Sequence, residues 1–150
     1  MDKKVLFTGT ALVVLFLLVA GCSQQGTSSV NAGSTTTAST PATPGPTQTL
    51  PSYWSVAVQV GSNGKAIDPQ IIMTFNGGEG MNLVPEIDFQ VTRTDGVVET
   101  GKLVQPLQEG QTITLAGTTG NYDRAEVWVI TPKGDRYEIY DQYVPFRSYH

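Results

Sequence analysis

Two acidic residues are spaced as a pair of catalytic carboxylates would be. Glu86 and Asp88 lie two positions apart in a run that alternates apolar and polar residues, so on a strand both side chains point to the same face. Their Cα atoms would then be about 6.6 Å apart, within the range of the paired acids of glycosidases. The same spacing is typical of the solvated face of any strand. We therefore expect the pair to keep a sheet soluble, and we predict no catalytic residue and no enzyme activity.

Three further acids, Asp95, Asp123 and Asp135, occupy predicted turns. Asp in a turn accepts hydrogen bonds from nearby backbone amides, although several such carboxylates at one end of a domain could also hold Ca²⁺. The chain contains no dense Asp/Asn/Gly loop of the calcium-binding type. Capping is therefore the expected role, and we predict no metal site and no cofactor.

The glycine-rich run and the single Cys and His lack the neighbouring residues that a phosphate-binding, metal or catalytic site would need. The run Gly77-Gly78-Glu79-Gly80 is not followed by Lys-Ser/Thr or by a predicted helix, so it indicates a strand connection rather than a phosphate-binding loop. The chain has 1 Cys and 1 His, the latter at position 150. Cys/His metal sites and Cys–His or Ser–His catalytic pairs are therefore not expected.

The net charge of residues 52–150 argues against nucleic acid as a partner. Residues 52–150 contain 7 basic and 12 acidic residues, a formal net charge of −5. Nucleic-acid binding depends on cations that release counterions from the phosphate backbone. We therefore expect no nucleic-acid partner.

Aromatic residues near the carboxyl end offer a candidate binding face. Pro132-Lys133-Gly134 predicts a hairpin turn in which Thr131 pairs with Asp135. In that register Val129 opposes Tyr137 and Val127 opposes Ile139, which makes this face core. The opposite face would then carry Trp128, Ile130 and Tyr140, with Trp128 and Tyr140 as diagonal neighbours. Such a rigid amphipathic surface suits a glycan or protein partner, unless a loop or the chain end covers it.

The elements that must position these residues are strands. Residues 52–150 are rich in Val, Ile and Thr, and Gly or Pro interrupts them at short intervals, which favours strands. About seven period-two runs can be traced, and no window has helical periodicity. The expected fold class is all-β, a seven-stranded immunoglobulin-like β-sandwich.

The amino-terminal part has a different composition. Lys3 and Lys4 precede an apolar run from Val5 to Gly21, which at about 1.5 Å per residue would be shorter than the ~30 Å core of a bilayer. Cleavage after this run is therefore expected, with an uncleaved anchor or an ordinary secretory signal as alternatives. In residues 23–51, 20 of 29 residues are Ser, Thr, Pro or Gly and none is charged, which predicts a disordered stalk, either O-glycosylated or unmodified.

The end of the apolar run, Val19-Ala20-Gly21-Cys22, resembles the lipobox of prokaryotic lipoproteins. This resemblance implies cleavage before Cys22, lipid attachment to its thiol and anchorage on the extracytoplasmic face of the cell membrane. The expected organisation is a signal peptide in residues 1–21, a stalk in residues 22–51 and a β-sandwich domain in residues 52–150.

Within the domain, Ile71–Gly78, Phe89–Thr92, Thr118–Arg124 and Ala125–Ile130 loosely resemble the β-domains of archaeal pilin-like and uncharacterised surface proteins. Pilins keep their apolar helix after cleavage, whereas the cleavage pattern here follows the apolar run. The expected function is a non-catalytic binding or structural module at the cell surface. A filament-associated, pilin-like subunit is the alternative, followed by a small hydrolase.

Overall fold

The computed structural model describes residues 42–148, and these contain seven strands and two short 3₁₀ turns. The all-β prediction is confirmed. The elements are η1 (Ser52–Trp54), β1 (Val58–Ser62), β2 (Gln70–Phe75), η2 (Glu79–Asn82), β3 (Glu86–Thr92), β4 (Val98–Val104), β5 (Thr112–Ala116), β6 (Tyr122–Ile130) and β7 (Arg136–Pro145).

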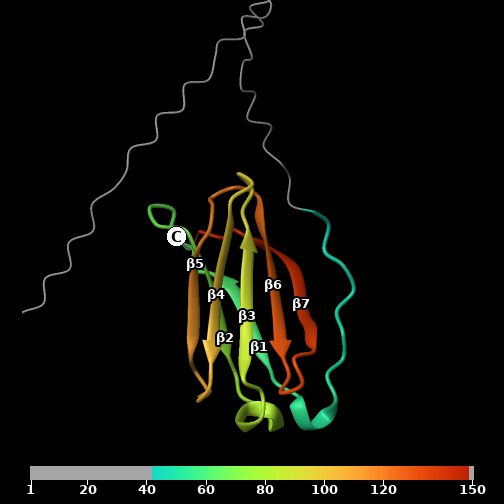
Figure 1. The fold of residues 1–150 in the computed structure, drawn as a ribbon. Coiled ribbons are helices and arrows are strands. Elements are labelled where there is room, and N and C mark those ends of the chain that lie inside the picture. Colours follow the sequence, from blue (N-terminus) through green and yellow to red (C-terminus); the bar gives the residue numbers. More distant parts are fainter. Residues whose placement is uncertain (1–41, 149–150) are drawn as a thin grey trace, which may run out of the picture. The chain divides into compact units, whose positions relative to one another are not determined.

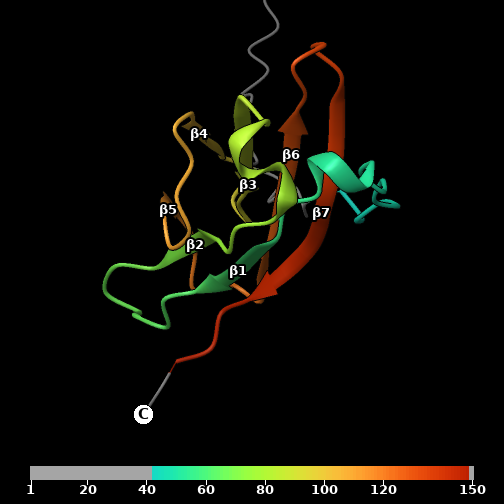
Figure 2. The ribbon, with the colours of Figure 1, turned by 90° about the horizontal axis from the view of Figure 1, so that it is seen from below.

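The strands form two antiparallel sheets that pack face to face as a β-sandwich (Figures 1 and 2). One sheet has the order β1-β2-β5, and the other has the order β4-β3-β6-β7. The chain crosses between the sheets after β2, β4 and β5, as expected of a Greek-key, immunoglobulin-like sandwich. Among residues 42–148 no helix has the length and apolar character needed to cross a membrane.

The core follows from the period-two patterns. On β3, Ile87, Phe89 and Val91 are buried and alternate with half-buried polar residues, so one face of this strand is core and the other is solvated. Each such side chain contributes about 1.5–3 kcal/mol through its burial. The buried apolar residues are Trp54, Ile71, Met73, Phe75, Val84, Ile87, Phe89, Val91, Leu107, Ile113, Leu115, Ala125, Val127, Val129 and Val144.

Gly101 allows the sheets to approach closely beside β4. A Cβ atom at this position would lie 2.6 Å from Cγ2 of Ile113 on the facing sheet. A side chain at position 101 would therefore push β5 away from β4.

The β6–β7 hairpin has the predicted turn but not the predicted register throughout. The Thr131 amide donates to the Asp135 carbonyl, and Val129 opposes Tyr137 as predicted. The pairing of Val127 with Ile139 is wrong, because Val127 opposes Tyr140 across a β-bulge. Ile139 is the extra residue of the bulge. Because of it, every later side chain of β7 lies on the face of the sheet opposite to the one predicted from a regular register.

Residues 42–51, here called the strap, run beside β7 (Figure 1). The Gln48 amide donates to the Glu138 carbonyl at 2.6 Å, and the Glu138 amide donates to Oε1 of Gln48 at 2.9 Å. Leu50 packs against the core. Contacts with the domain thus begin ahead of the predicted boundary at Ser52. The rest of the predicted stalk, residues 22–41, lies outside the described residues, as does the predicted signal peptide.

Candidate functional site: the outer face of the four-stranded sheet

The four-stranded sheet has a solvated outer face built from alternate residues of its strands, and most of the ion pairs of the described residues lie there. The register of the sheet places Asp88 beside Trp128 and Lys102, and Gln90 beside Glu126 and Thr100. The outward residues include Thr100, Lys102 and Val104 on β4, Glu86, Asp88 and Gln90 on β3, Arg124, Glu126, Trp128 and Ile130 on β6, and Arg136, Glu138 and Asp141 on β7.

A buried ion-pair network occupies the part of this face between β6 and β7. Nε and Nη2 of Arg124 each donate to Asp141 at 2.8 Å, and Nη2 also lies 2.9 Å from Glu126. The Asp141 side chain is 0% exposed. Burial by itself would raise the pKa of Asp141, but hydrogen bonds from Arg124 and from the Gly45 amide, together with the Arg124 charge, hold that pKa below its usual value. Arg124 is therefore the cation around which this region is organised.

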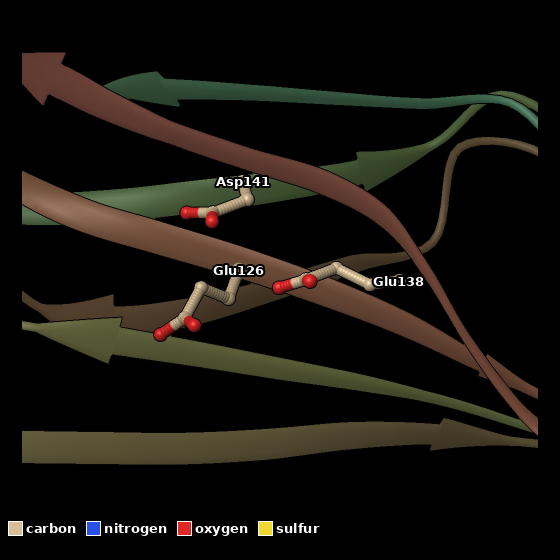
Figure 3. Close-up of side chains that lie close together, drawn as sticks. All are labelled: Glu126, Glu138 and Asp141. Atoms are coloured by element: carbon tan, nitrogen blue, oxygen red, sulfur yellow. The ribbon is translucent and has the colours of Figure 1, made fainter. Parts of the chain in front are cut away.

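Three acidic side chains of β6 and β7 lie close together (Figure 3). Glu126, Glu138 and Asp141 each offer a carboxylate oxygen, and these oxygens lie within 4.8 Å of one another. Two of the three carboxylates are bonded to Arg124. Burial raises the pKa of Glu138, and the charges of Asp141 and Glu126 raise it further. The guanidinium of Arg124 thus supplies a positive charge beside this group of acids.

Glu126 links this network to the centre of the face. Its Oε2 accepts a hydrogen bond from Nε2 of Gln90 at 2.9 Å. The Gln90 amide is thereby fixed, with its carbonyl oxygen left as an acceptor on the outer face.

A second set of paired charges lies toward the β6–β7 turn. Lys102 donates to Glu86 at 3.1 Å, and Nη2 of Arg136 lies 3.6 Å from Asp88. The Arg136 guanidinium also stacks over the ring of Trp128, 4.0 Å from its centroid. Such a contact is attractive.

A depression of about 370 Å³ opens beside this second set of charges. Its outward-facing lining combines a carboxylate, an amide, a hydroxyl and two cations. The lining residues are Asp88, Phe89, Gln90, Thr100, Gly101, Lys102 and Arg136.

The predicted acid pair borders this depression. Glu86 and Asp88 share the outer face of β3, as the alternation predicts. A hydrogen bond from Lys102 lowers the pKa of Glu86, whereas burial, followed by the hydrogen bond and charge of Glu86, raises the pKa of Asp88. Acid–base pairs in enzymes show opposite shifts of this kind. Here each carboxylate already faces its own cation, which favours a role in ordering those cations.

The predicted binding face is only partly assembled. Trp128 and Ile130 are half-buried on the outer face, as predicted. Because of the bulge, Tyr140 opposes Val127 and packs against the core instead of joining Trp128. Burial raises the pKa of Tyr140. Tyr140 lines a separate hollow of about 410 Å³, shared by residues of β1 with the carboxyl half of β7.

The three turn acids do not meet. Asp135 lies in the β6–β7 turn at one end of the sandwich, whereas Asp95 in the β3–β4 turn lies at the other end, as does Asp123, which is on β6 and not in a turn. Asp123 is 1% exposed, and its carboxylate accepts four hydrogen bonds from Thr94 and Thr118. It therefore accepts backbone amides, as the capping role predicts, but it also ties the β3–β4 turn to the β5–β6 loop, which local capping does not predict.

The glycine-rich run is a packing element. A Cβ atom at Gly78 would lie 2.4 Å from the Ser55 carbonyl oxygen, and its φ of +136° favours glycine. The Gly80 amide donates to that same carbonyl. The run therefore lets η2 and its flanking loop lie directly on the chain that follows η1. His150 and Cys22 lie outside the described residues.

Sequence reasoning missed the network centred on Arg124. Arg124 and Glu126 did carry a signal, because they alternate with buried residues of β6 and must therefore share its outer face. Their partner Asp141 was not predictable from the regular register, because the bulge brings it opposite Glu126.

No protein-family model, curated protein or solved structure matches this chain. What the outer face does is therefore inferred from its own residues.

Proposed function

We propose that this chain is a lipid-anchored protein of the extracytoplasmic face of the cell membrane, which presents a non-catalytic β-sandwich as a binding or structural module. The observation that carries the proposal is the sequence Val19-Ala20-Gly21-Cys22 at the end of a charged and then apolar amino terminus. The resemblance of this sequence to a lipobox assigns the anchor to the thiol of Cys22.

The domain fits such a role without help from disulfides. Cys22 is the only cysteine, so the sandwich is stabilised by its apolar core and by the polar clamps at its ends and outer face. The stalk ahead of the strap would separate this domain from the membrane. We expect its partner to be a glycan or a protein.

The non-catalytic part of the proposal rests on how the acids are used. Asp141 and Glu126 bind Arg124, Glu86 binds Lys102, and Asp123 binds threonine donors. A general acid or base needs to reach a substrate proton directly. These carboxylates instead fix neighbouring side chains, as a preformed binding surface requires.

The anchor is tested by expressing the full chain in a prokaryotic host and measuring the intact mass of the membrane-extracted protein. We expect a chain that begins at Cys22 and carries acyl chains, because two or more chains are needed for stable anchorage. The Cys22→Ala variant should stay uncleaved or leave the membrane fraction, whereas the Ser23→Ala control should behave as the parent chain does. An unmodified Cys22 in a chain that still begins at Met1 would contradict the proposal.

A further inference from the structure

The depression on the outer face is bounded by side chains that are already held in place. Glu126 fixes the amide of Gln90 at 2.9 Å, and Glu86 holds the Lys102 ammonium at 3.1 Å. Arg136 is restrained twice, by the Trp128 ring at 4.0 Å and by Asp88 at 3.6 Å. These contacts favour particular positions of the side chains, which lowers the cost of ordering them when a ligand binds.

The charges of the depression are balanced before any ligand arrives. Each of its two cations faces a carboxylate, Lys102 facing Glu86 and Arg136 facing Asp88. An anion would have to compete with these carboxylates, and a cation would have to compete with Lys102 and Arg136. The electrostatic match is therefore with a neutral, polar molecule.

The hydrogen-bonding groups restrict the ligand further. Asp88 offers acceptors, Lys102 and Arg136 offer donors, and the hydroxyl of Thr100 can do both. Adjacent sugar hydroxyls also donate and accept at the same time, so they can bridge such groups. A volume of about 370 Å³ is at the small end of ligand pockets and suits about one or two sugar rings.

We propose that the depression lined by Asp88, Gln90, Thr100, Lys102 and Arg136 is a binding site for a neutral saccharide. A neutral saccharide would be the ligand of the binding module proposed above, so this site rests on that proposed function. It does not depend on a lipid at Cys22. Trp128 is a positioning residue in this site, because its ring face is occupied by Arg136. This differs from the sequence prediction, in which Trp128 contacts the partner itself.

The test uses the full chain in a detergent without a sugar headgroup and measures binding calorimetrically. The probes are maltotriose, cellotriose, mannotriose and tri-N-acetylchitotriose, with trigalacturonate as the acidic counterpart. We expect at least one neutral trisaccharide to bind. Asp88→Ala should weaken that binding about tenfold or more, as the loss of a charged hydrogen-bond acceptor does. Thr114→Ala, an exposed position on β5 of the other sheet, should bind as the parent chain does.

The role of Trp128 is tested separately from its contribution to folding. Trp128→Ala should weaken saccharide binding, and Trp128→Phe should restore most of it because a ring face is again offered to Arg136. Thermal unfolding of each variant identifies any that fail to fold, and Gln90→Ala then serves as the second variant of the site.

Three results would overturn the proposal. In the first, no neutral trisaccharide binds, whether or not Cys22 proves to be lipidated. In the second, trigalacturonate alone binds, which would indicate an anion site. In the third, a neutral trisaccharide binds equally well to the parent chain and to folded Asp88→Ala and Gln90→Ala variants, which would place the site elsewhere.

Discussion

Replacing Asp123 with Ala tests whether the sandwich depends on a single carboxylate at one end. The carboxylate is buried and accepts the backbone amides of Thr94 at 2.9 Å and Thr118 at 2.7 Å, together with the hydroxyl groups of both threonines. In the Ala variant the two hydroxyls, 2.9 Å apart, can still bond to each other. The two amides lose their acceptor.

The expected magnitude follows from those two amides. Each buried donor left without an acceptor costs about 1–3 kcal/mol, so we expect a loss of roughly 4 kcal/mol in the free energy of unfolding. For a domain of about 100 residues this lowers the melting temperature by about 15–30 °C. Asp123→Asn should lower the free energy of unfolding by about half as much. Its side-chain carbonyl oxygen can still accept hydrogen bonds, but its NH₂ group replaces the second carboxylate oxygen and cannot accept one.

The assay is urea and thermal unfolding of a chain that begins at Ser23, with Asp95→Ala as the control at the same end of the sandwich. Asp95 is exposed and pairs with Arg93, so its loss should cost about 1 kcal/mol or less. Equal losses for Asp123→Ala and Asp95→Ala would refute the clamp. Millimolar Ca²⁺ should leave the parent melting temperature unchanged. A Ca²⁺-dependent rise that disappears in Asp123→Ala would show that the carboxylate holds a metal ion instead.

Two further predictions concern the strap and its neighbour Glu138. A chain that begins at Ser52 should have a free energy of unfolding about 1–3 kcal/mol lower than a chain that begins at Ala42, because it lacks the Gln48 hydrogen bonds and the packing of Leu50. Equal midpoints of unfolding in urea would show that the strap does not stabilise the domain. The folded-state pKa of Glu138 is raised above 4.5, so its ionised form costs stability as the pH rises through that pKa. Glu138→Gln should therefore be more stable than the parent chain at pH 7 and lose this advantage below about pH 4.5. A constant difference in stability across the pH range would contradict the sign of the shift.

The sequence was sufficient for the strands because burial on one face gives them a period of two. Ile87, Phe89 and Val91 identify β3 without knowledge of its neighbours, and the turn residues at Pro132–Gly134 locate the last hairpin. The same local signals place Glu86 and Asp88 together on the solvated face. These predictions depend only on residues close to one another in the chain.

What could not be predicted depends on contacts between distant segments. The bulge at Ile139 has no local sequence signal, yet it moves Tyr140 to the core side and brings Asp141 opposite Glu126. The strap has the composition of a stalk, and only its contacts with β7 show that part of it belongs to the domain. The depression could not be predicted either, because its residues come from three strands of the sheet.

The strap also determines how the domain responds to a pulling force. A load carried by the chain ahead of residue 42 reaches the sandwich first at Gly45, and only then at Gln48 and Leu50. Because Gly45 and Gln48 are attached to different residues of β7 and Leu50 packs against the core, a pull directed away from β7 would load these attachments in turn, before any strand of the sandwich is drawn out. Each residue released adds about 3.3 Å of extended chain. The strap is thus a short length of chain that would extend under such a pull while the strands of the sandwich stay paired.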